Sequence, residues 1–263
     1  MKRVLTTGSC LVALALVCAF AASAGAAVVA TPLPLELNKK QINMDMTYSG
    51  ENVVVSGAVP AGSQVAIVVT SKDNPPLTLT RKGKVAVFWM GIKQLEVCNM
   101  PSMYQVYTSA PLAGMGAGEE LGRLNIGYDN LRHLMVSKCV KGEPSDDDAD
   151  VLYKGYIRLK EKAGLYSMHE AAVKLGPDGR FEQAVAFPDK AAEGGYVISA
   201  YVFKDGALVA SGSDEVVARK VGLGKWLAIT AKERGGLYGS IAVLVALAAG
   251  LGVGAVFKKG SAH

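Results

Sequence analysis

Residues 237–257 read LYGSIAVLVALAAGLGVGAVF, a run of 21 residues without a single charge. As an α-helix this run would be roughly 30 Å long, which matches the hydrocarbon thickness of a bilayer. Lys232 and Arg234 stand before it, and Lys258 and Lys259 follow it. The alternative is a buried core helix, but such helices are usually shorter and lack charged residues at both ends. The sequence therefore predicts one transmembrane helix over residues 237–257, surrounded by membrane lipid.

Two glycines in this segment are candidates for helix packing. Gly250 and Gly254 form a GxxxG pair. Small residues at this spacing allow two helices to approach closely in lipid, which would permit a homodimer or another helix–helix contact. Glycine is also simply more frequent in membrane helices than in soluble ones, so the pair alone leaves both interpretations open.

The N-terminus has the pattern of a signal peptide over residues 1–27. Lys2 and Arg3 precede an apolar stretch at 11–22, and small residues of the A-x-A type follow. An uncleaved segment would instead add a second span. With a cleaved signal, the chain is predicted to be a single-pass protein of the inner (cytoplasmic) membrane, with most of the chain in the periplasm. The tail at 258–263 would then remain in the cytoplasm, as the positive-inside rule prefers.

The net charge gives no indication of nucleic-acid binding. The whole chain carries +5. Lys2, Arg3, Lys258 and Lys259 belong to the targeting and anchor ends, so the part between them carries only +1. A domain that binds nucleic acid needs a clear excess of basic side chains of its own. We therefore expect no nucleic-acid partner.

Two cysteines remain after the signal peptide. Cys10 and Cys18 lie within the predicted signal, whereas Cys98 and Cys139 belong to the exported region. An oxidising compartment would allow a Cys98–Cys139 disulfide, although two free thiols are equally compatible with the sequence. The spacing is not CxxC, so a redox site is not indicated.

The exported region predicts a fold that is mainly β with some α. Turn residues separate short apolar or alternating runs, which is typical of a β-sandwich at 28–110 and again at 164–222. A helical connector is expected at 111–163, and a juxtamembrane segment at 223–236. The expected strands are 42–48, 53–59, 64–71, 77–81, 85–89 and 104–109, and then 165–175, 180–187, 196–203, 207–211 and 216–221. The predicted architecture is two Ig-like β-sandwich units joined by helices, plus the C-terminal transmembrane helix.

Two helices are expected in the connector. Leu121, Leu124, Tyr128, Leu131 and Met135 are spaced by three and four residues, which predicts one amphipathic helix. A second helix is predicted at 149–163, where Gly164 is a suitable residue to follow the helix end.

Several short motifs occur in a characteristic order. They are Val87-Phe88-Trp89-Met90, Pro101-Ser102-Met103-Tyr104, Gly164-Leu165-Tyr166, Gly195-Tyr196 with Asp205-Gly206, and Leu237-Tyr238-Gly239. Together they resemble Alph_Pro_TM, a family of bacterial transmembrane proteins without an assigned molecular function, and the resemblance covers nearly the whole mature chain. It implies an accessory role beside TauE/SafE-type exporters, and so a multi-span transporter as a possible partner. It supplies no catalytic residues, and the two cysteines are not part of it.

No motif indicates catalytic, cofactor-binding or metal-binding residues. Asp146, Asp148 and Asp150 have the spacing that begins a calcium loop, but the required glycine and glutamate positions hold Val151 and Ile157. An acidic linker explains these aspartates better.

The remaining candidate side chains are also weak indicators. His133 and His169 lack a metal-binding spacing such as HxxxH. The glycine-rich stretch 114–118 lacks the Lys-Ser/Thr ending of a phosphate-binding loop. Four aromatic residues could line a recognition groove or fill the core: Trp89, Tyr104, Tyr107 and Tyr128. The core interpretation is favoured, because such aromatics more often fill a small sandwich core.

The expected function is that of a membrane-anchored accessory protein rather than an enzyme. Such a protein would bind a membrane partner, and a transporter is one possibility. The alternative is a periplasmic solute-binding or sensing module.

Overall fold

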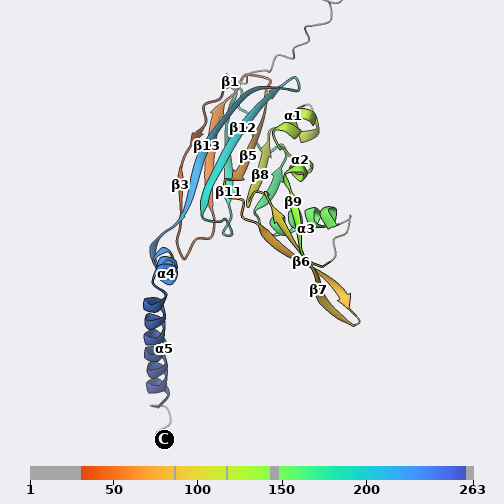
Figure 1. The fold of residues 1–263 in the computed structure, drawn as a ribbon. Helices are drawn as coiled ribbons and strands as arrows, with labels where there is room; N and C mark the ends of the chain where they lie inside the picture. Colours follow the sequence, from red (N-terminus) through yellow and green to blue (C-terminus); the bar gives the residue numbers. More distant parts are fainter. Residues whose placement is uncertain (1–30, 86, 117, 143–147, 259–263) are drawn as a thin grey trace, which may run out of the picture.

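The computed structural model describes residues 31–85, 87–116, 118–142 and 148–258. These residues form a mainly β body with 44% strand and 27% helix, from which one long C-terminal helix extends (Figure 1). The mainly β fold class is thereby confirmed. The predicted signal peptide at 1–27 and the tail from 259 onward lie outside the described residues.

A seven-stranded sheet is the centre of the body. Its main path runs β1, β13, β12, β5, β8, β10, and β3 pairs with β13 beyond the end of β1. The strands are β1 (Thr31–Pro32), β3 (Gln41–Met44), β5 (Gln64–Ser71), β8 (Tyr104–Thr108), β10 (Tyr166–His169), β12 (Gly194–Lys204) and β13 (Ala207–Lys220).

A smaller sheet covers one face of the large one. It contains β11 (Arg180–Phe187), β4 (Glu51–Ala58) and β2 (Glu36–Leu37). Val55 of β4, Phe181 of β11 and Ile198 of β12 belong to the apolar core that fills the space between the two sheets. This part of the fold is therefore a β-sandwich.

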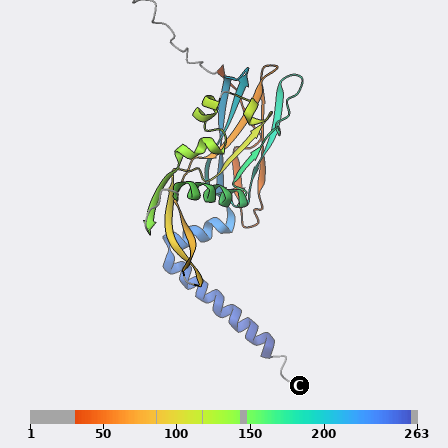
Figure 2. The same cartoon turned by 90° about the vertical axis from the view of Figure 1, so that its right-hand side faces the viewer.

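Helices and a third sheet cover the opposite face of the large sheet (Figures 1 and 2). The helices are η1 (Leu112–Gly114), α1 (Gly118–Arg123), α2 (Tyr128–Leu131), η2 (Arg132–Leu134) and α3 (Asp148–Lys162). The third sheet contains β6 (Leu77–Val85), β7 (Phe88–Cys98) and β9 (Val136–Lys141). A second apolar core fills the space between the large sheet and the helices, and the base of the β6–β7 hairpin packs into it.

The sequence of β5 explains its place between both cores. The strand reads QVAIVVTS, an almost continuous apolar run, as expected for a strand buried on both faces. Val65 and Ile67 point into the sandwich core, whereas the alternate residues Ala66 and Val68 face the helices.

The two predicted Ig-like sandwich units are not confirmed. β5 comes from the first predicted unit, yet its neighbours in the sheet are β12 of the second unit and β8 of the first. The expected boundaries at 110/111 and 163/164 therefore separate strands that are hydrogen-bonded to one another. Sequence alternation indicates which face of a strand is buried but not which strand lies beside it, and this explains the difference.

The predicted helix at Leu121–Met135 is also wrong in detail. The backbone of Asn125 and Gly127 is left-handed, with φ of 54° and 99°, so the stripe breaks into α1, α2 and η2. The second predicted helix is confirmed as α3. Gly164, with φ of 72°, follows it, and the Gly164 and Leu165 amides donate to the Glu161 and Lys160 carbonyls in a Schellman motif.

The C-terminal helices agree with the sequence expectation. α4 (Gly222–Glu233) covers the predicted juxtamembrane segment, and α5 (Gly235–Lys258) covers the predicted span. α5 leaves the body at one end, and most of the apolar side chains described on it, such as Leu244 and Leu251, are exposed. It is the one helix of the described chain that is long and apolar enough to cross a membrane.

Candidate functional site

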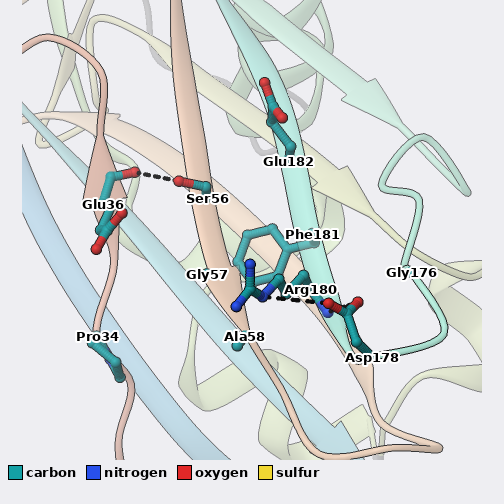
Figure 3. Close-up of a pocket in the computed structure, with 10 residues that line it drawn as sticks. All are labelled: Pro34, Glu36, Ser56, Gly57, Ala58, Gly176, Asp178, Arg180, Phe181 and Glu182. Atoms are coloured by element: carbon teal, nitrogen blue, oxygen red, sulfur yellow. Dashed lines mark hydrogen bonds and ion pairs between the residues drawn. The ribbon is translucent and has the colours of Figure 1, made fainter.

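One hollow of the described structure lies on the β11–β4–β2 sheet, as Figure 3 shows. It has a volume of about 580 Å³ and forms where the chain passes from β1 to β2, beside β4 and β11. Gly57 lies beside the ring of Phe181, and a Cβ at this position would come within 2.9 Å of that ring. The glycine therefore allows the ring to pack closely against β4 at the floor of the hollow.

Charged and polar groups surround this floor. Arg180 Nε lies 3.3 Å from Asp178 Oδ2, and the Ser56 hydroxyl donates to the Glu36 carbonyl oxygen at 3.4 Å. Glu182 adds a further carboxylate (Figure 3). The Arg180 and Asp178 side chains are 80% and 61% exposed, so water screens their attraction. The described side chains include no group of three or more that could hold a metal ion.

A second hollow, of about 310 Å³, lies between the large sheet and the helices. Polar residues line much of it, among them Thr70, Asn99, Asn125 and Ser199. The buried Oδ1 atom of Asn125 has no hydrogen-bond partner among the described residues. The hollow is therefore lined by a residue with an unpaired hydrogen-bond acceptor, which a polar solute could satisfy.

Tyr104 lines this second hollow and keeps its phenol protonated. Its hydroxyl donates to the Asn125 carbonyl oxygen at 2.8 Å and accepts from the Gly127 amide at 2.8 Å. Burial raises the pKa of Tyr104 well above its ordinary value. Both hydrogen bonds hold the irregular turn between α1 and α2, which gives Tyr104 a structural role.

The Pro101-Ser102 segment is the point at which α3 attaches to the large sheet. The hydroxyls of Tyr156 and Tyr166 both donate to the Pro101 carbonyl oxygen, at 3.1 and 2.6 Å, and Lys160 Nζ donates to the Ser102 carbonyl oxygen at 2.9 Å. Desolvation lowers the pKa of Lys160. Two motifs of the family resemblance, at 101–104 and 164–166, thus meet in space and have structural roles.

Of the two possibilities that the sequence leaves open for Cys98 and Cys139, the structure has the one with both thiols free, and the disulfide stays untested. Cys98 lies on β7 and Cys139 on the adjacent β9, but the register pairs Cys98 with Val136 and Cys139 with Leu95. The cysteines are therefore on neighbouring strands but are not opposite each other.

The aspartates of the calcium-like motif bind cationic side chains. Asp148 is buried and pairs with Lys93 at 2.6 Å and Arg81 at 3.1 Å, and Asp150 pairs with Arg132. Asp146 lies outside the described residues. Sequence reasoning missed the Asp148 contacts because Arg81 and Lys93 are 55 or more residues away from it in the chain.

The two histidines lie on different elements. His133 belongs to η2, whereas His169 is in β10 and stacks on Tyr107 with 4.8 Å between the ring centroids. The core interpretation of the aromatics is confirmed for Tyr104 and Tyr107, which are buried. The side chain of Trp89 lies outside the description.

Open space surrounds the predicted helix-packing glycines. A Cβ added at Gly250, Gly252 or Gly254 would meet nothing within 4 Å. Gly250 and Gly254 are four residues apart and so share one face of α5, while Gly252 points to the other side. This small-residue face is thus available for a close helix contact.

Comparison with known proteins agrees with the anchor. A search of curated proteins finds no match. The family model described as "Putative transmembrane protein (Alph_Pro_TM)" matches residues 32–259, which include the β body as well as α5. The chain therefore belongs to the Alph_Pro_TM family of transmembrane proteins.

Proposed function

We propose that this protein is a single-pass membrane-anchored accessory protein whose β body lies in the periplasm and whose α5 helix associates with a multi-span membrane protein. A TauE/SafE-type exporter is the partner that we propose, and this choice comes from the family resemblance. The observation that carries the proposal is α5 itself, which is apolar, exposed over Gly235–Gly254 and glycine-rich on one face.

Helix association in lipid depends on close packing, because lipid tails are as apolar as the side chains themselves. The face with Gly250 and Gly254 offers the smallest possible side chains to a neighbouring helix. The described part of the body has no cluster suited to metal catalysis, and its hollow of about 580 Å³ is lined by solvated charges. These features favour an interaction role for the protein.

The test is mild detergent extraction of tagged full-length protein from membranes, followed by mass spectrometry of the proteins that come with it. We expect a stoichiometric multi-span protein with the unmodified chain and its loss with the double variant Gly250→Leu/Gly254→Leu. Gly252→Leu is the matched control, because it adds the same side chain on the other side of α5 and should retain the partner. A protein that purifies alone, or only as a homodimer, would contradict the proposal.

A solute-binding role is the second candidate, and the 310 Å³ hollow favours it. The unpartnered Oδ1 of Asn125 and the neighbouring Thr70, Asn99 and Ser199 offer hydrogen bonds to a small polar solute. A ligand would raise the melting temperature of the purified protein, and Asn125→Ala should abolish that shift. The solutes to test are small anions and sulfur compounds, which the proposed link to a TauE/SafE-type exporter suggests. An unchanged melting temperature across them would count against this candidate.

A further inference from the structure

The β6–β7 hairpin has an apolar tip that the described chain leaves uncovered. Val87 and Phe88 are 76% and 70% exposed, and Met90 and Ile92 are 52% and 43% exposed. Farther along β7, Leu95 is buried in the core on the helix side of the body. The strand thus changes from core packing at its base to full exposure at its tip. A contiguous exposed apolar patch of this kind marks an interaction site.

The hairpin has one apolar and one basic face. Phe88 and Met90 alternate along β7 and so share a face. Ile92 lies where the β6–β7 register shifts, and its side chain reaches the same face because it lies over Gly83, where a Cβ would come within 2.5 Å of its Cδ1 atom. Lys82 and Lys84 flank Gly83 and point to the opposite face. Residues 81–93 include no acidic residue.

A salt-bridge cluster fixes the base of the hairpin to α3. Arg81 and Lys93 are opposite each other in the β6–β7 register, and both pair with the buried carboxylate of Asp148. The Lys93 side chain is only 15% exposed, so water screens this contact less than a surface pair. The hairpin is therefore held at a defined angle to the body.

The hairpin projects toward the end of the molecule from which α5 extends. Both views place its tip beyond the rest of the body and level with the first part of α5 (Figures 1 and 2). The tip thus points to the side on which a bilayer crossed by α5 would lie.

We propose that the β6–β7 tip is a second membrane contact, which inserts Val87, Phe88 and Met90 into the interface of an anionic bilayer while Lys82 and Lys84 bind lipid phosphates. Apolar side chains with nearby lysines are the combination that interfacial binding to anionic lipid requires. Together with α5, this contact would fix the orientation of the body on the membrane. The inference rests on the membrane anchor of the proposed function but not on a partner protein.

The test measures lipid contact by fluorescence quenching in the full-length protein. Trp89 and Trp226, the two native tryptophans, are replaced by Phe, and one new tryptophan is introduced as Phe88→Trp. The protein is reconstituted into vesicles of phosphatidylcholine and phosphatidylglycerol whose acyl chains carry bromine. We expect loss of fluorescence for Phe88→Trp and a smaller loss in vesicles without phosphatidylglycerol.

Three control positions make the result decisive. Ile92→Trp lies farther from the tip on the same face and should be quenched less, and Leu159→Trp, on α3, should not be quenched. Val243→Trp reports on α5. Quenching at 243 without quenching at 88 overturns the hairpin contact alone, whereas absence of quenching at both overturns the hairpin contact and the membrane anchor together. Because no partner is present in the vesicles, a positive result stands even if the proposed transporter association fails.

Discussion

Tyr156 and Tyr166 make a redundant pair of hydrogen bonds whose removal should be strongly non-additive. Both hydroxyls donate to the buried Pro101 carbonyl oxygen, with Tyr166 at 2.6 Å and Tyr156 at 3.1 Å. Replacement of either by Phe keeps the ring and leaves the carbonyl with one donor. Each single variant should therefore lose only the net free energy of one hydrogen bond, about 1 kcal/mol of unfolding free energy. Tyr166→Phe should lose more than Tyr156→Phe, because its hydrogen bond is shorter.

The double variant removes both donors and leaves a buried carbonyl unsatisfied. That desolvated acceptor costs roughly 1–3 kcal/mol beyond the two lost bonds. We therefore expect a total loss of about 3–5 kcal/mol and a coupling free energy well above the error of a double-mutant cycle.

The assay is urea unfolding of the full-length protein in detergent, monitored by far-ultraviolet circular dichroism. The free energy of unfolding is extrapolated linearly to zero urea for the unmodified protein, both single variants and the double variant. Tyr238→Phe serves as the control, because Tyr238 is 41% exposed at the start of α5. Strictly additive losses would refute the reasoning that one hydroxyl can replace the other at Pro101.

Three further predictions concern backbone, pH and thiols. Gly179→Ala should destabilise the protein by more than about 2 kcal/mol, because φ is 76° and the new Cβ would lie 2.0 Å from the Val59 carbonyl oxygen. Gly62→Ala is the control: φ is 74° but the space around it is open, so it should cost only about 1 kcal/mol in the same unfolding assay. Burial raises the pKa of Tyr153 from 10.0 to about 12, so the folded state keeps this phenol protonated. Its contribution to stability is complete below pH 10 and is lost as the pH rises through 12. Tyrosinate absorbance at increasing pH should show this phenol ionising together with unfolding. A tyrosinate signal that is complete before the circular dichroism changes would contradict that linkage. Cys98 and Cys139 should both react with a maleimide in unreduced, denatured protein, adding two labels by mass spectrometry, whereas a protein that takes up labels only after reduction would show that the bridge forms.

Local features of the chain were predictable because they depend on neighbouring residues. The apolar run of α5, the end of α3 at Gly164 and the tight Asp205-Gly206 turn, with φ of 51° and 81°, all follow from residues within a few positions of each other. Segment length, a left-handed glycine and turn chemistry are sufficient for such predictions. Non-local pairing explains the misses: the stripe from Leu121 to Met135 had the right helical period, but the turn at Asn125 is held by Tyr104 of β8, from another part of the chain.

The sequence by itself determined the candidate membrane span, the mainly β composition and the family, since each of these depends on composition, on local periodicity or on motif order. Only the tertiary structure decided that β5 lies between β12 and β8, that Asp148 joins Arg81 and Lys93, and that the 87–92 tip is uncovered. The alternating apolar residues of β7 look the same at Leu95, which is buried, as at Phe88, which is exposed. Whether an apolar side chain is core or contact surface depends on what packs against it, and that is fixed by strands and helices far away in the chain.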